Sequence, residues 1–170
     1  MSKAIFSSTM SSPVGLLTLV GQGDDLVGLY FDKDPLAARM RADSRRDDRR
    51  LRPAIEQLEE YFAGTRTRFD LSLVPPGTAF QKKVWAALVR IPFGGTATYG
   101  EIARAVGRPD ASRAVGGANH RNPIAVIIPC HRVIGADGSM TGYGGGLPRK
   151  RLLLDLETRV AAAGQLALAL

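Results

Sequence analysis

The strongest constraint on the fold is a change of sequence pattern at Pro75-Pro76-Gly77. Before this segment, short apolar or β-branched runs are separated by turn compositions, as expected for strands. After it, apolar residues recur mainly at helical spacing. The tripeptide is therefore the best candidate for a linker. The sequence predicts an α+β chain with an N-terminal α/β support domain over residues 1–75 and a C-terminal domain over residues 76–170.

The N-terminal half predicts a small antiparallel sheet with a helix. A β-meander is the simplest arrangement of its three apolar runs, with a return strand expected over Phe69–Val74. From Leu51 onward apolar residues recur at helical spacing, Pro53 suits a first helical turn and Gly64 suits the end of the helix. The three predicted strands are Ala4–Ser8, Leu16–Val20 and Leu26–Phe31.

The C-terminal half is predicted to be mainly helical. An apolar stripe from Phe80 to Ile91 indicates a first helix. A short helix over Thr98–Val106 and another that begins near Asp110 are separated by a turn containing Gly107. Two short helices joined in this way are typical of a helix-turn-helix, although many helical domains contain such a pair.

The second helix of this pair has an unusual composition, Arg113-Ala114-Val115-Gly116-Gly117-Ala118. Each of the two glycines costs about 1 kcal/mol relative to alanine inside a helix, so their presence requires a reason. Together with Ala114 and Ala118 they form a small-residue face that could enter a DNA groove. Close packing on another helix is the alternative explanation.

The remainder of the chain surrounds its only cysteine. The apolar run Ile124–Ile128 predicts a buried strand that leads to Cys130. The glycines of Thr141–Gly146 predict a loop with exposed backbone N–H groups, and Pro148 suits the start of a last helix that extends to Glu157.

The net charge of +7 lies entirely in the second half of the chain. Residues 1–75 carry 11 basic and 11 acidic side chains, whereas residues 76–170 carry 12 basic and 5 acidic ones. Such an asymmetry favours a surface that faces a polyanion, since neutralising phosphates releases counterions. A basic surface without a partner is the alternative. The segment Arg39–Arg52, with seven arginines and three aspartates, is more typical of a solvated surface than of a phosphate-binding arm, and we leave it out of the site.

The composition also limits the chemistry. One cysteine cannot form an internal disulfide, and with only two histidines the usual zinc ligand sets cannot be assembled, so we expect no metal and no cofactor. No apolar run has the length of a membrane span or a signal peptide, and we expect a soluble cytoplasmic protein. Cys130 is then either a small buried hydrophobe or a reactive thiol.

The residue next to Cys130 is one of the two histidines, His131. The thiolate is the competent nucleophile, and a nearby imidazole or helix N-terminus lowers the pKa of a thiol. In an extended chain, however, adjacent side chains leave opposite faces, so a water molecule is expected to bridge the two groups. A carboxylate behind His131 would orient its ring, and Glu157 is the candidate.

These motifs resemble the O6-alkylguanine-DNA alkyltransferase family. The resemblance rests on Pro129-Cys130-His131-Arg132-Val133, on the helix from Arg113 to Ala118, on Asn122-Pro123 and on Gly142-Tyr143-Gly144-Gly145-Gly146. It covers roughly Thr78 to Glu157, while the N-terminal half matches only in its outline of strands and helix. Some family members hold zinc in the N-terminal domain, and this chain lacks the cysteines for that site.

The resemblance implies direct repair of double-stranded DNA by a methylated-DNA–protein-cysteine methyltransferase. The O6-alkyl group of a flipped guanine would pass irreversibly to Cys130, once per molecule. His131 would act through water as its base, Glu157 would orient that histidine, Tyr99 would donate a hydrogen bond to the guanine, and Asn122 would brace the turn beside Cys130.

The resemblance also implies how DNA is held. Arg113 would fill the gap in the base stack, and Ala114, Gly116, Gly117 and Ala118 would lie in the minor groove. We expect a monomer, and cooperative binding along DNA remains open. The base pocket would be formed by Pro129, Val133, Tyr143, Gly144 and Gly145.

Three other functions compete with this one. A lesion-binding protein of the alkyltransferase-like group would recognise alkylguanine without repairing it, but those relatives have lost the acceptor cysteine, which is present here as Cys130. A cysteine hydrolase would need a dyad that adjacent residues are poorly placed to form. A basic regulator would use the helix-turn-helix but would leave Pro129–Val133 unexplained.

Overall fold

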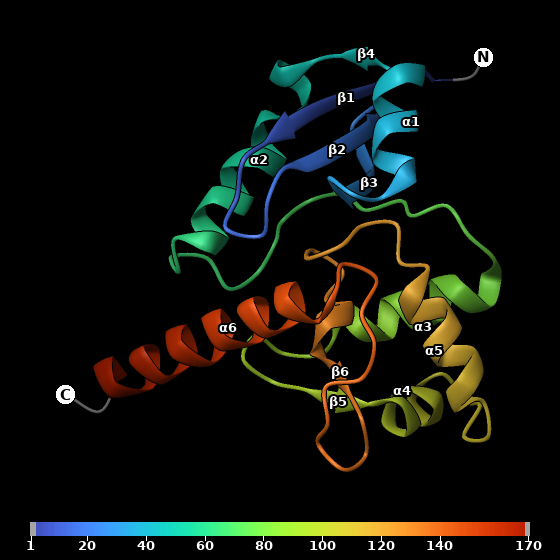
Figure 1. Ribbon diagram of the computed structural model, residues 1–170, viewed down its shortest axis with the longest axis vertical. Coiled ribbons are helices and arrows are strands. Elements are labelled where there is room, and N and C mark those ends of the chain that lie inside the picture. The colour runs from blue at the N-terminus through green and yellow to red at the C-terminus, as the bar shows by residue number, and fades with distance from the viewer. Residues whose placement is uncertain (1–2, 169–170) are drawn as a thin grey trace. The chain divides into compact units, whose positions relative to one another are not determined.

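The computed structural model describes residues 3–168, which belong to two compact units (Figure 1). The first unit extends to Pro76 and also includes Pro123–Ala125, and the second comprises Gly77–Asn122 and the residues from Val126 onward. The first unit contains a four-stranded, mostly antiparallel sheet, and the second is mainly helical. The predicted α+β class is therefore confirmed.

The sheet of the first unit has the strand order β3-β2-β1-β4. Its first three strands form the predicted antiparallel meander, and the fourth is a short strand that runs parallel to β1. The predicted return strand over Phe69–Val74 is wrong: within the described chain it is reduced to an isolated bridge between Leu26 and Leu73. The strands are β1 (Ile5–Met10), β2 (Leu17–Gln22), β3 (Asp25–Phe31) and β4 (Arg45–Arg46).

Two helices, α1 (Pro35–Asp43) and α2 (Asp48–Phe62), flank this sheet (Figure 1). Each begins at an aspartate, Asp34 or Asp47, whose side chain accepts a hydrogen bond from a backbone N–H of the first turn. Because Asp47 caps α2, that helix begins before the predicted Leu51, and Pro53 lies inside it.

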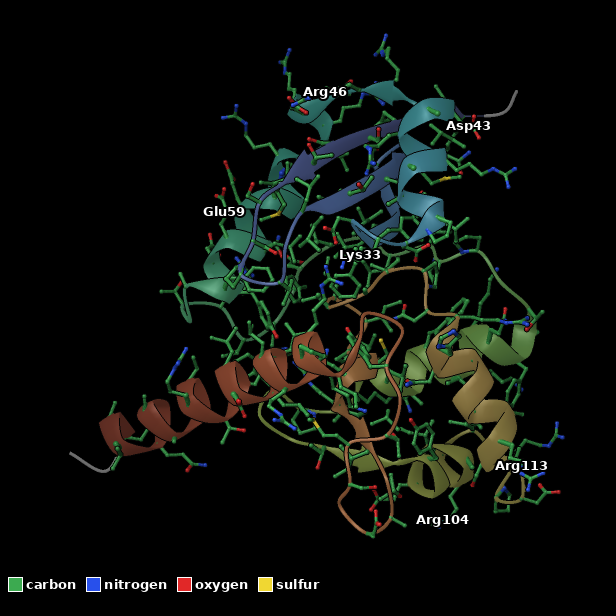
Figure 2. The ribbon with its side chains drawn as sticks, in the orientation of Figure 1. Lys33, Asp43, Arg46, Glu59, Arg104 and Arg113 are labelled. Atoms are coloured by element: carbon green, nitrogen blue, oxygen red, sulfur yellow. The ribbon has the colours of Figure 1, made fainter. Side chains whose placement is uncertain are left out.

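The arginine-rich segment Arg39–Arg52 forms the end of α1, strand β4 and the start of α2. Its arginines are exposed, and several pair with aspartates of the same segment. Arg46 lies 3.0 Å from Asp48 and extends away from the ribbon (Figure 2). Charged side chains on an edge strand also disfavour pairing with another sheet. These features agree with the prediction of a solvated surface.

The second unit is built from four α-helices and one short 3₁₀-helix within the described residues. Threonines 78 and 98 start α3 and α4 with capping boxes, in which side chain and backbone bond reciprocally. Trp85 of α3 donates its indole N–H to the carbonyl of Ala118, 2.9 Å away, and so fixes α5 against α3. The helices are α3 (Ala79–Val89), α4 (Tyr99–Ala105), α5 (Ser112–His120), η1 (Cys130–Arg132) and α6 (Leu147–Leu168).

The predicted helix-turn-helix is present as α4 and α5, with Gly107 at φ 76° in the connecting turn. A two-stranded parallel ribbon, β5 (Ala97–Thr98) with β6 (Val133–Ile134), joins the start of α4 to the segment that follows Cys130. No helix between residues 3 and 168 is long and apolar enough to span a membrane.

The predicted strand over Ile124–Ile128 is wrong. The segment is buried, but Val126 has φ 68°, in the left-handed region that β-branched residues rarely adopt. This conformation turns the chain, so a regular ladder cannot continue. The side chain of Asn122 donates to the carbonyl of Ile128 at 2.8 Å and stabilises the turned segment just before Cys130.

Candidate active site

Cys130 begins the 3₁₀-turn η1 and is 6% exposed. Its backbone N–H donates to Ile128, while its carbonyl accepts hydrogen bonds from the Asn119 amide at 3.3 Å and from the N–H of Val133. The prediction of a bridging water assumed an extended chain, but the chain is turned at this point. The cysteine is held in one conformation by bonds on both sides.

The environment of the thiol resists ionisation in the resting site. Burial raises the pKa of the Cys130 thiol, while hydrogen bonds with the side chains of Asn122 and Tyr143 and the positive charge of Lys150 act in the opposite direction. Burial also lowers the pKa of His131 and keeps its ring neutral, so no imidazolium charge favours the thiolate. A proton must therefore leave the thiol during the reaction.

His131 is fully buried and its Nε2 lies 2.7 Å from Oε1 of Glu157. Burial by itself would raise the pKa of Glu157, but hydrogen bonds from His131 and Arg132 and the positive charge of Arg132 outweigh it and hold the pKa at about 2. Because this carboxylate is ionised and can only accept, Nε2 carries the ring proton. Nδ1 then presents a lone pair, and it has no hydrogen-bond partner among the described residues.

Arg132 completes this buried cluster. Its Nε and Nη2 lie 2.8 and 2.9 Å from the two oxygens of Glu157, and Nη1 donates to the carbonyl of Ile91 at 2.7 Å. Its guanidinium also lies over the ring of Phe93. Both oxygens of Glu157 are thus engaged, which fixes the carboxylate that orients His131.

The loop after β6 carries the predicted base-pocket residues. Tyr143 is half-buried with its hydroxyl directed to the thiol, and Gly144 is exposed beside His120. The carbonyl of Gly145 accepts a hydrogen bond from Arg149. The Tyr99 hydroxyl lies 2.7 Å from the Thr141 hydroxyl, which links the start of α4 to this loop. Pro129 and Val133 are buried on either side of η1.

The residues of α5 that were predicted to face DNA lie partly on an exposed side of the helix and partly on a buried one. Arg113, Ala114 and Gly117 are exposed and Gly116 is half-buried, and the arginine extends away from the ribbon (Figure 2). A Cβ added at Gly117 would meet no atom within 4 Å. The expectation for Ala118 is wrong: its side chain is buried because that face of α5 packs on α3, as the bond from Trp85 shows.

The structure thus brings Cys130, His131, Glu157, Asn122 and Tyr143 together, and α5 presents a separate exposed surface. Sequence reasoning missed three contributors: Arg132, Asn119 and Lys150. The last is fully buried on α6, where it lies seven residues, or about two turns, before Glu157. That spacing places both polar side chains on one face of the helix and was the available signal.

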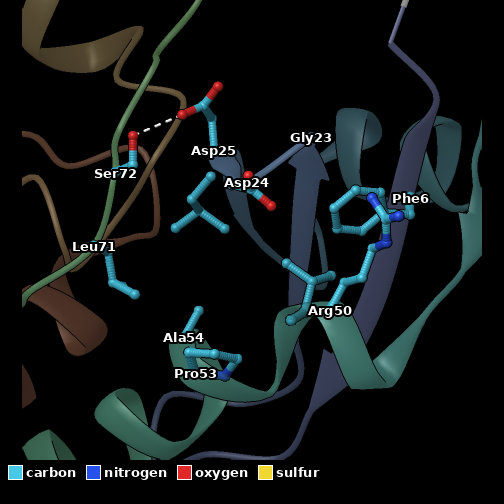
Figure 3. Close-up of a pocket in the computed structure, with 11 residues that line it drawn as sticks. Phe6, Gly23, Asp24, Asp25, Arg50, Pro53, Ala54, Leu71 and Ser72 are labelled. Carbon is cyan, nitrogen blue, oxygen red and sulfur yellow. Dashed lines mark hydrogen bonds between the residues drawn. The ribbon is translucent and has the colours of Figure 1, made fainter.

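A hollow of about 250 Å³ lies in the first unit (Figure 3). Its lining includes Asp25, which accepts a hydrogen bond from the Ser72 hydroxyl at 2.6 Å. It is lined by residues such as Phe6, Leu26, Leu51 and Ala54. None of the predicted site residues lies in it.

Comparisons with known proteins identify the family of this chain. A model of the 6-O-methylguanine DNA methyltransferase DNA-binding domain matches residues 79–159, and a model of the ribonuclease-like domain of that enzyme matches residues 5–75. A methylated-DNA–protein-cysteine methyltransferase of Mycolicibacterium paratuberculosis is 51% identical over 155 residues, which cover 91% of this chain and 93% of the relative. One from Methanosarcina acetivorans is 49% identical and covers 90% and 98%.

Solved structures give the same result. The crystal structure of Mycobacterium tuberculosis O6-methylguanine methyltransferase matches with a TM-score of 0.85 and 49% identity, covering 91% of this chain and 93% of that one. A structure of M. tuberculosis OGT in complex with DNA matches with a TM-score of 0.85 and 50% identity, covering 91% and 94%. The chain belongs to the methylated-DNA–protein-cysteine methyltransferase family.

Proposed function

We propose that this protein repairs DNA by transferring the O6-methyl group of guanine, or a related alkyl group, to Cys130. The thiolate sulfur attacks the methyl carbon, the carbon–oxygen bond breaks, and the electron pair leaves with the guanine, which takes up a proton. The products are unmodified guanine in DNA and S-methylcysteine in the protein. Because a thioether is stable in water, each molecule acts once.

The observation that carries this proposal is the buried His131–Glu157 pair beside the chain's only thiol. Nδ1 of the neutral imidazole has an unused lone pair and can accept the thiol proton through one water molecule. Glu157, with its pKa at about 2, then stabilises the imidazolium. The thiol stays protonated until a substrate is present, which suits a nucleophile that can be used only once.

The substrate must reach a thiol that is 6% exposed. The alkyl group lies inside the duplex, so the nucleotide is extruded into the site before transfer. We assign Tyr99 to donate to the departing guanine, and the loop around Tyr143, Gly144 and Gly145 to close over it. Pro129 and Val133 form the adjoining wall, and Asn122 holds the turn before the nucleophile.

DNA is the partner, as it is of the M. tuberculosis relative in the complex. The excess positive charge of residues 76–170 provides sequence-independent affinity for phosphates. Gly116, Gly117 and Ala114 allow α5 to lie close to the walls of the minor groove, and Arg113 fills the gap in the stack. A monomer located in the cytoplasm is sufficient for this activity.

The test follows the fate of the lesion. A duplex carrying O6-methylguanine within a restriction site that the lesion blocks is incubated with excess protein, purified and digested. We expect cleavage to be restored by the wild type and not by Cys130→Ser, while both bind the duplex. A duplex that is bound but stays resistant to cleavage would instead identify a lesion-binding protein.

A further inference from the structure

Lys150 is a buried cation that the transfer mechanism above does not use. Its side chain is fully buried in α6, among the least exposed in the described chain. Its Nζ donates to the carbonyl of Val133 at 2.6 Å and to the carbonyl of Thr141 at 3.2 Å. No carboxylate of the described residues lies within ion-pair distance of it. A buried ammonium group without an anionic partner is costly and therefore needs an explanation.

The hydrogen bonds of Lys150 lead to the nucleophile along the backbone. The ammonium group contacts the carbonyl of Val133, and the N–H of Val133 donates to the carbonyl of Cys130. Its second acceptor is the backbone carbonyl of Thr141, whose side-chain hydroxyl lies 2.7 Å from the hydroxyl of Tyr99. Thr141 also lies two residues before Tyr143, whose side chain is directed to the thiol. Lys150 therefore joins the two segments that surround Cys130.

The charges around the thiol are unbalanced in the resting site. The buried charged or titratable groups on the elements around it are His131 and Arg132 from η1 and Glu157 and Lys150 from α6, and Tyr143 of the loop acts on the thiol directly. His131 is neutral, and Glu157 offsets the charge of Arg132 by direct contact. The charge of Lys150 remains, and it becomes balanced when the thiol loses its proton.

We propose that Lys150 is a positioning residue for alkyl transfer, whose ammonium group fixes the segments around Cys130 and serves as the counter-charge of the thiolate. This inference rests on the proposed function of the site. The electrostatic interaction of this one pair agrees with the geometry: the charge of Lys150 lowers the pKa of the Cys130 thiol, and the thiolate raises the pKa of Lys150, which burial holds below its ordinary value.

The decisive variant is Lys150→Gln, which keeps N–H donors for the two carbonyls but removes the charge. Because Cys130 is the only cysteine, the ultraviolet absorbance of its thiolate can be followed as a function of pH without interference from other thiols. We expect the thiolate to form at higher pH in Lys150→Gln than in the wild type. If the thiol pKa rises by about one unit, methyl transfer at pH 7 should be about tenfold slower, because the thiolate fraction then falls about tenfold. Binding to the duplex should be unchanged.

Two further variants make the result specific. Leu153→Ala removes a fully buried apolar side chain from the same helix and should lower stability without moving the thiolate titration. Lys150→Arg keeps the positive charge and should titrate close to the wild type even if Lys150→Gln does not fold. The inference would be overturned if Lys150→Gln titrated at the same pH as the wild type and Lys150→Arg. It would also be overturned if Leu153→Ala shifted the titration as much as Lys150→Gln does. Failure of the wild type to transfer a methyl group would instead refute the proposed function, since the titration needs no DNA.

Discussion

Oε1 of Glu157 accepts a hydrogen bond from Nε2 of His131 over 2.7 Å, and both side chains are buried. This contact decides which nitrogen of the imidazole carries the proton. Nδ1 is therefore the base. It can accept the thiol proton of Cys130 through a water molecule, without direct contact between the two side chains. The same carboxylate also neutralises Arg132, so Glu157 serves the fold as well as the reaction.

The first prediction concerns stability in acid. The folded pKa of Glu157 is about 2, below its ordinary value of 4.5, so the ionised form stabilises the native state. This contribution is complete above about pH 4.5 and is lost as the pH falls toward 2, with a size on the order of 3 kcal/mol. We expect urea-unfolding midpoints of the wild type to fall more steeply over this range than those of Glu157→Gln. At pH 7 the variant should be less stable, because Arg132 loses its counterion. Parallel pH profiles of the two proteins would contradict the assignment.

The second prediction separates base flipping from chemistry. Arg113 is exposed on α5, so Arg113→Ala should slow repair of a duplex while leaving the reaction with free O6-alkylguanine nearly unchanged. The matched control is Arg159→Ala, which removes one exposed arginine from α6 and changes the net charge equally. Rates on both substrates are measured in single-turnover experiments. Equal losses on the duplex and on the free base would exclude the proposed role of the arginine.

A third prediction uses the glycines of α5. Gly117→Ala should stabilise the helix by up to about 1 kcal/mol, since the new Cβ would meet no atom within 4 Å. If α5 lies against the walls of the groove, the same methyl group should weaken binding to the duplex. Gly164→Ala in α6 is the control, because its Cβ would also be in open space and should give the stability gain alone. Unchanged affinity in Gly117→Ala would place the groove contact elsewhere.

The sequence predicted the parts of the fold that depend on local patterns. The meander, the helix from Leu51 and the helix-turn-helix follow from turn residues and apolar spacing close together in the chain. Helix α1 and strand β4 were not predicted. The strand over Ile124–Ile128 was wrong because its apolar composition is that of any buried segment, and the left-handed backbone at Val126 has no sequence signal. The prediction of a return strand over Phe69–Val74 was wrong because strand pairing depends on a partner distant in sequence. Within this segment only Leu73 forms a bridge, with Leu26.

The sequence predicted which residues form the site more completely than it predicted their protonation states. The contact of His131 with Glu157 was expected, whereas the raised pKa of the thiol was not, because burial of Cys130 depends on packing from several elements. Ala118 illustrates the same limit, since a small residue in a helix suits a groove and a helix–helix contact equally well. Lys150 was missed because a lysine in a helix is normally exposed.

The most direct test of the account is the stoichiometry of transfer. The protein is incubated with increasing amounts of a duplex containing O6-methylguanine, and intact-mass and peptide analysis locate the product. We predict that the modification stops at one methyl group per molecule, on Cys130, however much duplex is added. Repair of several lesions per molecule, or a methyl group on any other residue, would contradict the central claim.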